Sequence, residues 1–522
     1  SAFPYALMSD LSTAYRSCKT KRLTNSCRRF FWFTDPLDEN SLIELMFVVS
    51  TFGDKPSGNI LGQELNIIAN DKKVSADTKS FINNCFYVDD GITSSTTKAR
   101  LLRIREELPG SFERYSFKVK HILLNFEASA GVTSETDKEQ CLGVVWNFIT
   151  DEIVPALGVY LSKKVRGAHV GDPMTLEGIA TCTFTQRIVL RVLGSLHDLC
   201  GRHLCPLICS ARICYGEVCK ANLEKKWDTP VKNIEVIENI TNLFKSIVKV
   251  KESLLPMARS WVPAGSQLSY TIFPLDGGIK AFGSIGYARS SSKANSDPKT
   301  IKHSSNIMAA KCKISSLDVG DNELSSSLMA ARMAEVIHNS LPEDVPGVKC
   351  VLITDSKCTA FSHSENFNHT ERRRRNIGVR FQRSIRRLHS ENDGLPVVLC
   401  WGRSQTNPAD LVSKVHPDIH EVLNSSFYRH GSPLYLENDF PQNFDVYAYM
   451  SGQKWTWVGF PNQDQHVLTC GFCQTVCTQT VSEVAARLLA TAQLNFQGQG
   501  QHSTLPVEHL PDSAAEHGFS RE

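Results

Sequence analysis

The segment INNCFYVDDGITS, residues 82–94, places two adjacent aspartates directly behind an apolar run. Neighbouring carboxylates repel each other, so Asp89 and Asp90 need either open water or a bound cation. The alternating apolar residues predict a β-hairpin with Asp89-Asp90-Gly91 at its turn. For a bare Asp-Asp pair, a plain polar turn is the commoner interpretation.

The segments around this hairpin predict a mixed α+β region. Residues 5–10 and 44–53 are rich in strand-forming residues, residues 57–71 have helical spacing, and a helix followed by a strand is expected between about 100 and 125. Asp10 would close the first strand. Together with Asp89 and Asp90 it would form an oxygen cage for two divalent cations, which is what nucleotidyl transfer requires.

The middle of the chain predicts helices without a catalytic constellation. Residues 185–227 are helical and apolar, broken by Pro206, and a further helix is expected between Val231 and Val250. The chain has 17 cysteines, an odd number that does not suggest a disulfide framework and favours a reducing compartment. One group of cysteines recurs every four or five residues and is expected to pack in the core of a helix: Cys200, Cys205, Cys209, Cys214 and Cys219. A second group, with His466 nearby, could bind zinc, although free thiols are the favoured interpretation: Cys470, Cys473 and Cys477.

A second set of acids belongs to an α/β region of alternating strands and helices that follows residue 256. Asp276 and Asp355 each follow an apolar strand, whereas Glu323 and Asp410 each open a helix. Carboxylates at strand ends and helix starts can meet at one edge of a sheet and hold two metal ions for phosphodiester hydrolysis. Each acid alone could instead be a helix cap.

Length and charge set the remaining limits. At 522 residues the chain should form several domains, and its net charge of +3 means that nucleic-acid affinity must come from local patches. One such patch holds eight arginines between residues 372 and 387, including Arg380 and Arg383; a solvated helix face or an import signal is the alternative. No run of 18 apolar residues occurs, so no membrane partner is expected.

YVDD at residues 87–90 resembles the catalytic turn of reverse transcriptases, and the text around it resembles the polyprotein of Pao/BEL-type LTR retrotransposons, whose region is often labelled a Pao peptidase family. The resemblance covers residues 1 to 441 through landmarks in the family's order: MSDLSTAYRS (8–17), RRFFWF (28–33), VVSTFGDKPSG (48–58), LGVVWNFITDEI (142–153), LDGGIKAFGSIGYAR (275–289), LITDSK (352–357), WGRSQTNPADLVSKV (401–415) and SSFYRHGSPLYLENDFP (425–441).

The resemblance implies two catalytic sites, each with two Mg²⁺ ions. Asp10, Asp89 and Asp90 would bind the polymerase metals, and Tyr15 would be the aromatic gate under the deoxyribose. The ribonuclease H ligands would be Asp276, Glu323, Asp355 and Asp410. RNA template, RNA–DNA hybrid and dNTP are the implied partners, with Arg380 and Arg383 on a hybrid-binding helix.

Several positions depart from the family pattern. The lysine of the family's usual F-x-L-x-K-W motif falls on His121, with Lys120 beside it. The template grip has Ser57-Gly58 in place of Ser-Pro, and the ribonuclease H opening has Gly277-Gly278 in place of Ala-Ser. From the resemblance we further expect that this sequence lacks the fingers segment before Asp10 and the protease and integrase segments of such a polyprotein.

We therefore expect a multidomain protein of α+β and α/β class. A partial reverse-transcriptase palm would span 1–130, a mostly helical thumb or connection region 131–255, a ribonuclease H-like domain 256–425, and a linker or poorly ordered tail 426–522. The expected location is intracellular, cytoplasmic with nuclear entry allowed. Whether the chain is an active enzyme stays open; the alternatives are a degenerate or host-retained nucleic-acid-binding relic and a structural module built on the cysteine-rich helices.

Overall fold

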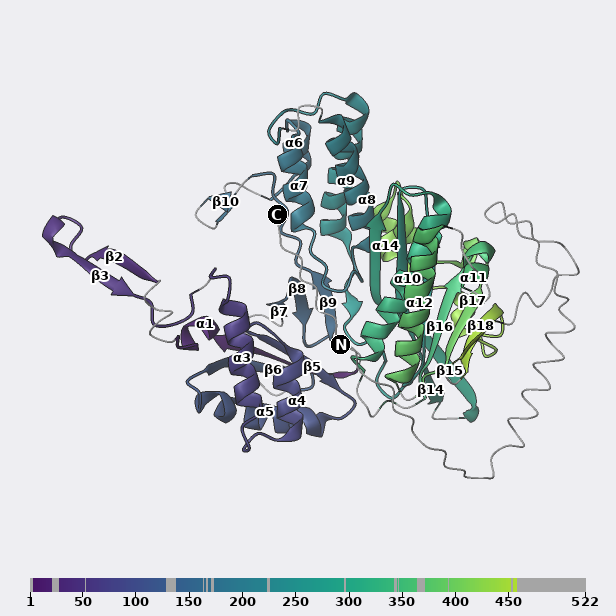
Figure 1. The fold of residues 1–522 in the computed structure, drawn as a ribbon, viewed down its shortest axis with the longest axis horizontal. Coiled ribbons are helices and arrows are strands. Elements are labelled where there is room, and N and C mark those ends of the chain that lie inside the picture. The colour runs from purple at the N-terminus through teal and green to yellow at the C-terminus, as the bar shows by residue number, and fades with distance from the viewer. Residues whose placement is uncertain are drawn as a thin grey trace, which may run out of the picture. The chain divides into compact units, whose positions relative to one another are not determined.

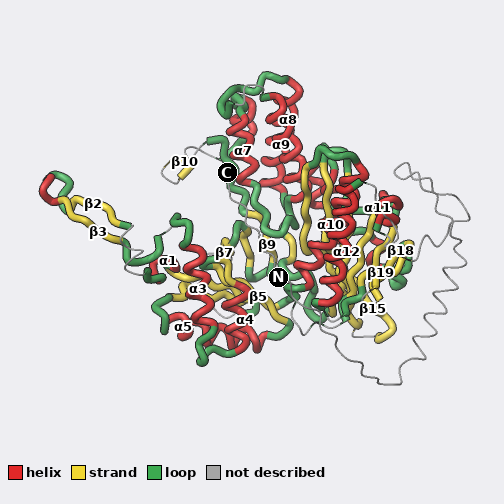
Figure 2. Tube along the Cα trace, viewed as in Figure 1, coloured by secondary structure: helices red, strands yellow, loops and turns green. Residues whose placement is uncertain are grey.

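The computed structural model shows a mixed α+β protein (Figures 1 and 2). The chain divides into two units, residues 1–457 and 458–522, and the second lies outside the described residues. The structure describes residues 3–457 except for 21–27, 52, 128–137, 163, 166–167, 170–172, 223–225, 295–296, 342–344, 346, 364–370, 393 and 452–453. Among the described residues, none of the helices combines the length and hydrophobicity that crossing a bilayer requires.

The N-terminal sheet carries the first set of acids. Its order is β4-β5-β1-β6, with β1 (Tyr5–Ser12) antiparallel to both β5 (Asp90–Ser95) and β6 (Lys118–Leu124), and β4 (Phe86–Tyr87) outside β5. Three helices, α3 (Ser57–Ala69), α4 (Ala76–Cys85) and α5 (Lys98–Glu113), share a buried core with this sheet. The short helix α1 (Ala14–Ser17) follows β1, and β2 (Arg29–Phe33) pairs with β3 (Leu42–Met46) after the turn η1 (Glu39–Ser41). The predicted helix over 57–71 and the helix and strand between 100 and 125 are confirmed.

The middle region combines a small sheet with a helical cluster. The sheet has the order β12-β9-β8-β7, and its helices include α7 (Gln186–Ser195), α8 (Cys205–Ala221) and α9 (Ile234–Ser253). The prediction that Pro206 breaks a helix is wrong. Pro206 lies in the first turn of α8, where the N–H that proline lacks would have had no intrahelical partner. The other elements are β7 (Lys138–Cys141), β8 (Val144–Asn147), β9 (Glu152–Pro155), β10 (Lys164–Val165), β11 (Ala168–His169), α6 (Leu176–Ala180) and β12 (Met257–Ala258).

The cysteines of this region confirm the core prediction only in part. Cys205, Cys209 and Cys214 are buried on α8, but Cys219 is exposed and Cys200 precedes the helix and is also exposed. Position 209 lies near 205 on the helix, but 214 lies on the opposite side, so α8 is buried on more than one face, and the exposed Cys219 belongs to its last turn.

The second large sheet has the order β15-β14-β13-β16-β17-β18-β19. Its first strands, β13 (Gln267–Gly277), β14 (Ala281–Ala294) and β15 (Asp297–Ile314), form an antiparallel meander. Next to β13 lie β16 (Lys349–Thr354) and β17 (Val397–Trp401), both parallel to it. The strands β18 (Asp445–Ser451) and β19 (Lys454–Trp457) extend the sheet in antiparallel fashion.

Helices cover this sheet. The helices α10 (Val319–His338) and α12 (Arg372–Ser390) lie side by side, with α10 against β13 and β14 (Figure 1). They run in parallel, because Arg374 pairs with Asp321 near their starts and Arg387 pairs with Glu335 near their ends. The remaining elements are α11 (Lys357–Ser362), η2 (Ser404–Thr406), α13 (Asp410–Ser413), α14 (Ile419–Asn424), α15 (Ser426–His430) and η3 (Pro433–Leu436).

The expectation of a poorly ordered tail from residue 426 does not hold for its first part. Tyr428 and Tyr435 are fully buried, and Tyr287 of β14 donates a hydrogen bond to the carbonyl of Tyr428 at 2.8 Å. Two large aromatic side chains bury enough apolar surface to fix α15 and η3. The prediction of a poorly ordered tail rested on the polar composition beyond residue 436, whereas both buried tyrosines lie before that residue.

Candidate active sites

Three carboxylates meet at one edge of the second sheet. Asp276 is the second-last residue of β13, Asp355 directly follows β16, and Asp410 is the first residue of α13. Because β13 and β16 are parallel neighbours, their carboxyl ends reach the same edge. One oxygen from each of the three acids lies within 4.8 Å of the others.

Glu323 adds a fourth carboxylate beside these three. It lies in the second turn of α10, which begins after Asp318 caps its N-terminus. The backbone N–H of Gly277 donates to its carboxylate. A Cβ atom on Gly277 would lie 2.3 Å from the backbone nitrogen of Glu323, so the close approach requires glycine at this position. The tight packing of α10 on β13 therefore accounts for glycine at this position.

The electrostatics of the cluster show mutual repulsion. Burial, together with the charges of Asp276 and Asp355, raises the pKa of Glu323 to about 9. Burial also raises the pKa of Asp276 to about 6, with Asp410 and Asp355 adding to the shift. Burial and the Asp410 charge raise the pKa of Asp355 as well. Close carboxylates with raised pKa values are a frequent feature of catalytic sites.

The donor set fits a hard divalent cation. Among the described residues, Glu323 Oε2 and Asp410 Oδ1 are buried and accept no hydrogen bond. An unpartnered buried carboxylate oxygen is costly unless a cation satisfies it. All four acids offer only oxygen, the ligand type that Mg²⁺ prefers.

Four further residues hold these acids in place. Ser413 donates a hydrogen bond to Asp276 Oδ2, and Lys414 Nζ lies 2.9 Å from Asp410 Oδ2. Ser404 and Asn407 make side-chain hydrogen bonds to Asp355. Their roles were not predicted from the sequence. The spacing of four residues between Asp410 and Lys414 was the signal that could have indicated their pairing.

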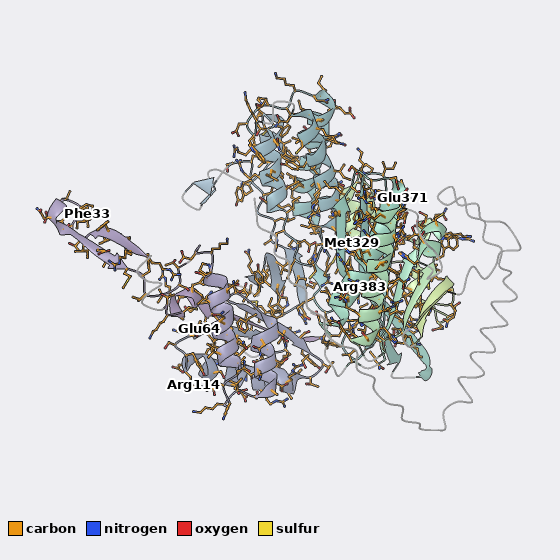
Figure 3. The ribbon with its side chains drawn as sticks, in the orientation of Figure 1. Phe33, Glu64, Arg114, Met329, Glu371 and Arg383 are labelled. Carbon is orange, nitrogen blue, oxygen red and sulfur yellow. The ribbon has the colours of Figure 1, made fainter. Side chains whose placement is uncertain are left out.

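The arginines of α12 fall into two groups. Arg374 is buried and serves the fold, donating to Asp321 at 2.7 Å and to Asp318 at 3.2 Å. Arg380 and Arg383, the predicted substrate-binding pair, are exposed about one turn apart, and Figure 3 labels Arg383. They form a charged outer face that can contact phosphates, while Arg374 cannot.

The first set of acids lies on neighbouring strands. Asp10 of β1 and Asp90 of β5 are directly opposed residues. Two details of the prediction are wrong: β1 continues two residues beyond Asp10, and the hairpin turn consists of Val88 and Asp89, because Tyr87 pairs with Asp90. Val88 has a φ of 62°, which a β-branched residue rarely adopts. The left-handed residue makes the two-residue turn feasible and places Asp89 at its tip.

The other predicted polymerase residues surround these acids. Lys120 Nζ lies 2.9 Å from Asp10 Oδ2, at a β-bulge where β6 loses register with β1. The neighbouring His121 is the residue directly opposite Asp10, but Lys120 provides the positive charge. Tyr15 on α1 has its pKa raised by burial and then by the charge of Asp89, which places its hydroxyl in the field of that acid.

Asp10, Asp89 and Asp90 are less tightly grouped than the acids of the second site. Within the part of the chain that the structure describes, Asp276, Asp355 and Asp410 alone form a group close enough to share a metal ion. Asp90 interacts with the Cys141 thiol of β7; burial raises the pKa of Asp90, and that hydrogen bond acts against the increase. The possible zinc ligands Cys470, Cys473 and Cys477, with His466, lie outside the described residues.

No protein-family model matches the sequence, and no curated protein matches it. Among solved structures, a foamy viral protease-reverse transcriptase in complex with double-stranded DNA shares 10% identity over 77% of this chain and 58% of its own, with a TM-score of 0.40. The N-terminal ribonuclease H domain of a Mycobacterium tuberculosis protein, solved as a fusion with maltose binding protein, shares 13% identity over 30% of this chain and 96% of its own, with a TM-score of 0.20. Ribonuclease H1 from Halobacterium salinarum shares 12% identity over 27% of this chain and 91% of its own, with a TM-score of 0.16.

The chain thus spans 58% of the length of the first of these structures. At such identities a likeness concerns the fold alone. The chemistry of this chain has to be argued from its own residues.

Proposed function

We propose that residues 256–425 form a ribonuclease H that cleaves RNA in an RNA–DNA hybrid. The single observation that carries this proposal is the approach of Asp276, Asp355 and Asp410 to within 4.8 Å at one sheet edge, with Glu323 beside them. Such a cluster would hold two Mg²⁺ ions, which supply charge stabilisation at the phosphodiester during its hydrolysis.

The other residues of the domain would bind and orient. Ser413 fixes the Asp276 carboxylate, and Ser404 and Asn407 fix that of Asp355. Arg380 and Arg383 would contact backbone phosphates without regard to sequence, which suits an enzyme that recognises the shape of a hybrid.

A second activity, RNA-directed DNA polymerisation, is proposed for residues 1–130. It is supported by Asp10 opposite Asp90, by Asp89 at the tip of a strained turn, and by Tyr15 in the field of Asp89. RNA template and dNTP would be its substrates. Lys120, whose Nζ pairs with Asp10, would contact the phosphates of the dNTP. Residues 131–255 would then be the connection region of a Pao/BEL-type retroelement polyprotein. A relic that binds nucleic acid without turnover is the alternative for both sites.

The decisive experiment measures Mg²⁺-dependent cleavage of the RNA strand of a hybrid by the full chain. We expect cleavage by the parent and nearly complete loss in Asp355→Asn. The matched control is Asp418→Asn, which neutralises an exposed aspartate of the same domain and should leave the rate unchanged. Hybrid binding without cleavage by a folded parent would support the relic instead.

A further inference from the structure

A lysine already occupies part of the acid cluster. Lys414 caps the C-terminal end of α13, and its Nζ lies 2.9 Å from Asp410 Oδ2. Its field extends further: burial acts to lower the pKa of Lys414, but the hydrogen bond to Asp410 and the charges of Asp276 and Asp355 outweigh it and raise the pKa. The ammonium therefore interacts with all three of the acids that lie within 4.8 Å of one another.

The contact of Lys414 differs from the contact made by the preceding residue. Ser413 is buried and holds Asp276 with an uncharged hydroxyl, which does not compete with a cation. The Lys414 side chain is 48% exposed, and an ammonium on a four-carbon stem can swing into solvent at little cost. The ion pair between Lys414 and Asp410 can therefore open without burying an unpaired ammonium.

We propose that Lys414 is a positioning residue that neutralises the acid cluster before metal binds and then turns to a backbone phosphate of the hybrid. This inference deepens the proposed function and rests on it. A divalent cation at Asp410 and the ammonium repel each other, so metal binding expels Lys414 from the cluster. The expelled ammonium stays at the rim of the site, where a bound hybrid brings phosphates.

This exchange predicts opposite effects on the two ligands when the ammonium is removed. Mg²⁺ should bind more tightly, because it no longer displaces a cation. The hybrid should bind more weakly, because it loses one phosphate contact. If Lys414 only braced Asp410, its removal would weaken both.

The test uses the full chain with Lys414→Met, Lys414→Arg and a charge control, Lys302→Met. Lys302 is exposed on the same sheet, where it pairs with Ser292 of β14. Ser292 lies 11 positions from Ala281, the end of β14 next to the acid cluster, so Lys302 is roughly 35 Å from the site. Mg²⁺ binding is measured without nucleic acid, as the rise in melting temperature with concentration. Hybrid affinity is measured in Mg²⁺ with an RNA strand carrying 2′-O-methyl groups, so that binding is separated from cleavage.

We expect Lys414→Met to lower the Mg²⁺ half-saturation about three- to fivefold, the scale of a partly exposed ion pair, and to weaken hybrid binding by a similar factor. The salt dependence of hybrid binding should fall by about one counterion. Lys414→Arg should restore the hybrid affinity, and Lys302→Met should change neither quantity. Weaker Mg²⁺ binding by Lys414→Met, or unchanged binding of both ligands, would overturn the inference while leaving cleavage by the parent intact. A parent that neither binds Mg²⁺ nor cleaves would instead overturn the proposed function itself.

Discussion

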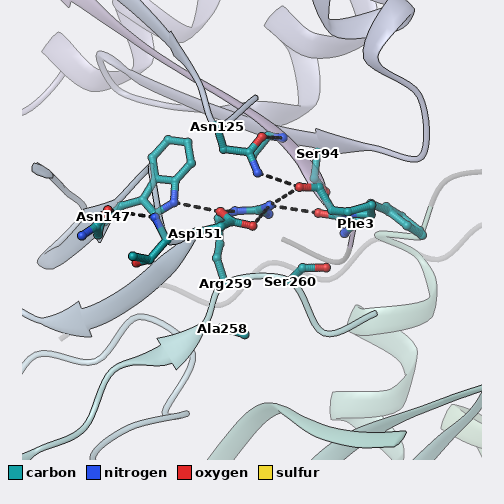
Figure 4. A network of polar contacts seen from close by, with 12 residues as sticks. Phe3, Ser94, Asn125, Asn147, Asp151, Ala258, Arg259 and Ser260 are labelled. Carbon is teal, nitrogen blue, oxygen red and sulfur yellow. Dashed lines mark hydrogen bonds and ion pairs between the residues drawn. The ribbon is translucent and has the colours of Figure 1, made fainter. Parts of the chain in front are cut away.

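Arg259 grips both carboxylate oxygens of Asp151, at 2.7 and 2.8 Å, from a side chain that is almost fully buried (Figure 4). The same guanidinium donates to the carbonyls of Phe3 and Pro4, and the Trp146 indole also donates to Asp151. Arg259, which directly follows β12, thus joins the residues just before β1 to the turn after β8. Such a buried charge stabilises the structure only while its partners remain.

We predict that Arg259→Met destabilises the chain by about 3–5 kcal/mol, because it leaves the partly buried Asp151 carboxylate without its cation. Arg259→Lys should recover little, since an ammonium cannot make two parallel hydrogen bonds. The measurement is the shift of the urea midpoint. Arg187, which makes the same paired contact with Asp228 but in solvent, is the control: Arg187→Lys should be close to neutral.

The turn residue Val88 supports a different prediction. A φ of 62° lowers the stability of the fold when the residue is β-branched, whereas glycine adopts this conformation without such a penalty. Val88→Ala keeps only the Cβ methyl group and Val88→Gly removes that as well, so the two variants differ mainly in backbone freedom. We expect the glycine variant to be the more stable by about 1 kcal/mol, measured by thermal unfolding.

The usual order should hold at Val119 of β6, which has no such backbone conformation. There the alanine variant should be the more stable of the two. Equal stability of Val88→Gly and Val88→Ala would show that the turn is not strained.

The strand-end acids could be predicted from the sequence because each depends on local pattern alone. An apolar strand that ends in Asp355, and another that ends in Asp276, meet at one edge once the strands are parallel. The turn at Val88 and Asp89 could not be predicted, because it needs a left-handed backbone at Val88 that a β-branched residue rarely adopts, whereas the Asp90-Gly91 pair that follows is of a favoured turn type. The contact of Ser413 with Asp276 joins residues 137 positions apart, so only the tertiary structure reveals it.

The packing of α10 on β13 makes Gly277 the most restrictive position of the second site. Alanine there would place its Cβ 2.3 Å from the Glu323 nitrogen and 2.6 Å from the Asn322 carbonyl carbon. We predict a destabilisation of roughly 1–3 kcal/mol from overpacking, together with loss of the rise in melting temperature that Mg²⁺ produces.

The control for this substitution is Gly216→Ala in the interior of α8. Nothing lies within 4 Å of a Cβ there, so alanine should raise stability by about 0.5–1 kcal/mol and leave the Mg²⁺ response unchanged. A Gly277→Ala variant with normal melting and a normal Mg²⁺ response would show that α10 can retreat from β13 without cost.

The repulsion among the acids predicts how stability depends on pH in EDTA. The Glu323 carboxyl keeps its proton in the folded protein up to a pKa of about 9, against an ordinary 4.5. The folded state therefore binds more protons than the unfolded state between these values, and stability must fall as pH rises through that window. Below about pH 4.5 this contribution is fully present.

Melting temperature measured from pH 5 to pH 9 in EDTA should fall less steeply for Glu323→Gln than for the parent, because the amide does not titrate. Glu421→Gln, which changes an exposed residue of α14, should keep the parent's slope. Saturating Mg²⁺ should reduce the slope of the parent, since the cation binds the ionised carboxylates and favours the loss of their protons. If the melting temperature of the parent depends on pH equally in Mg²⁺ and in EDTA, Glu323 is not a ligand of the metal.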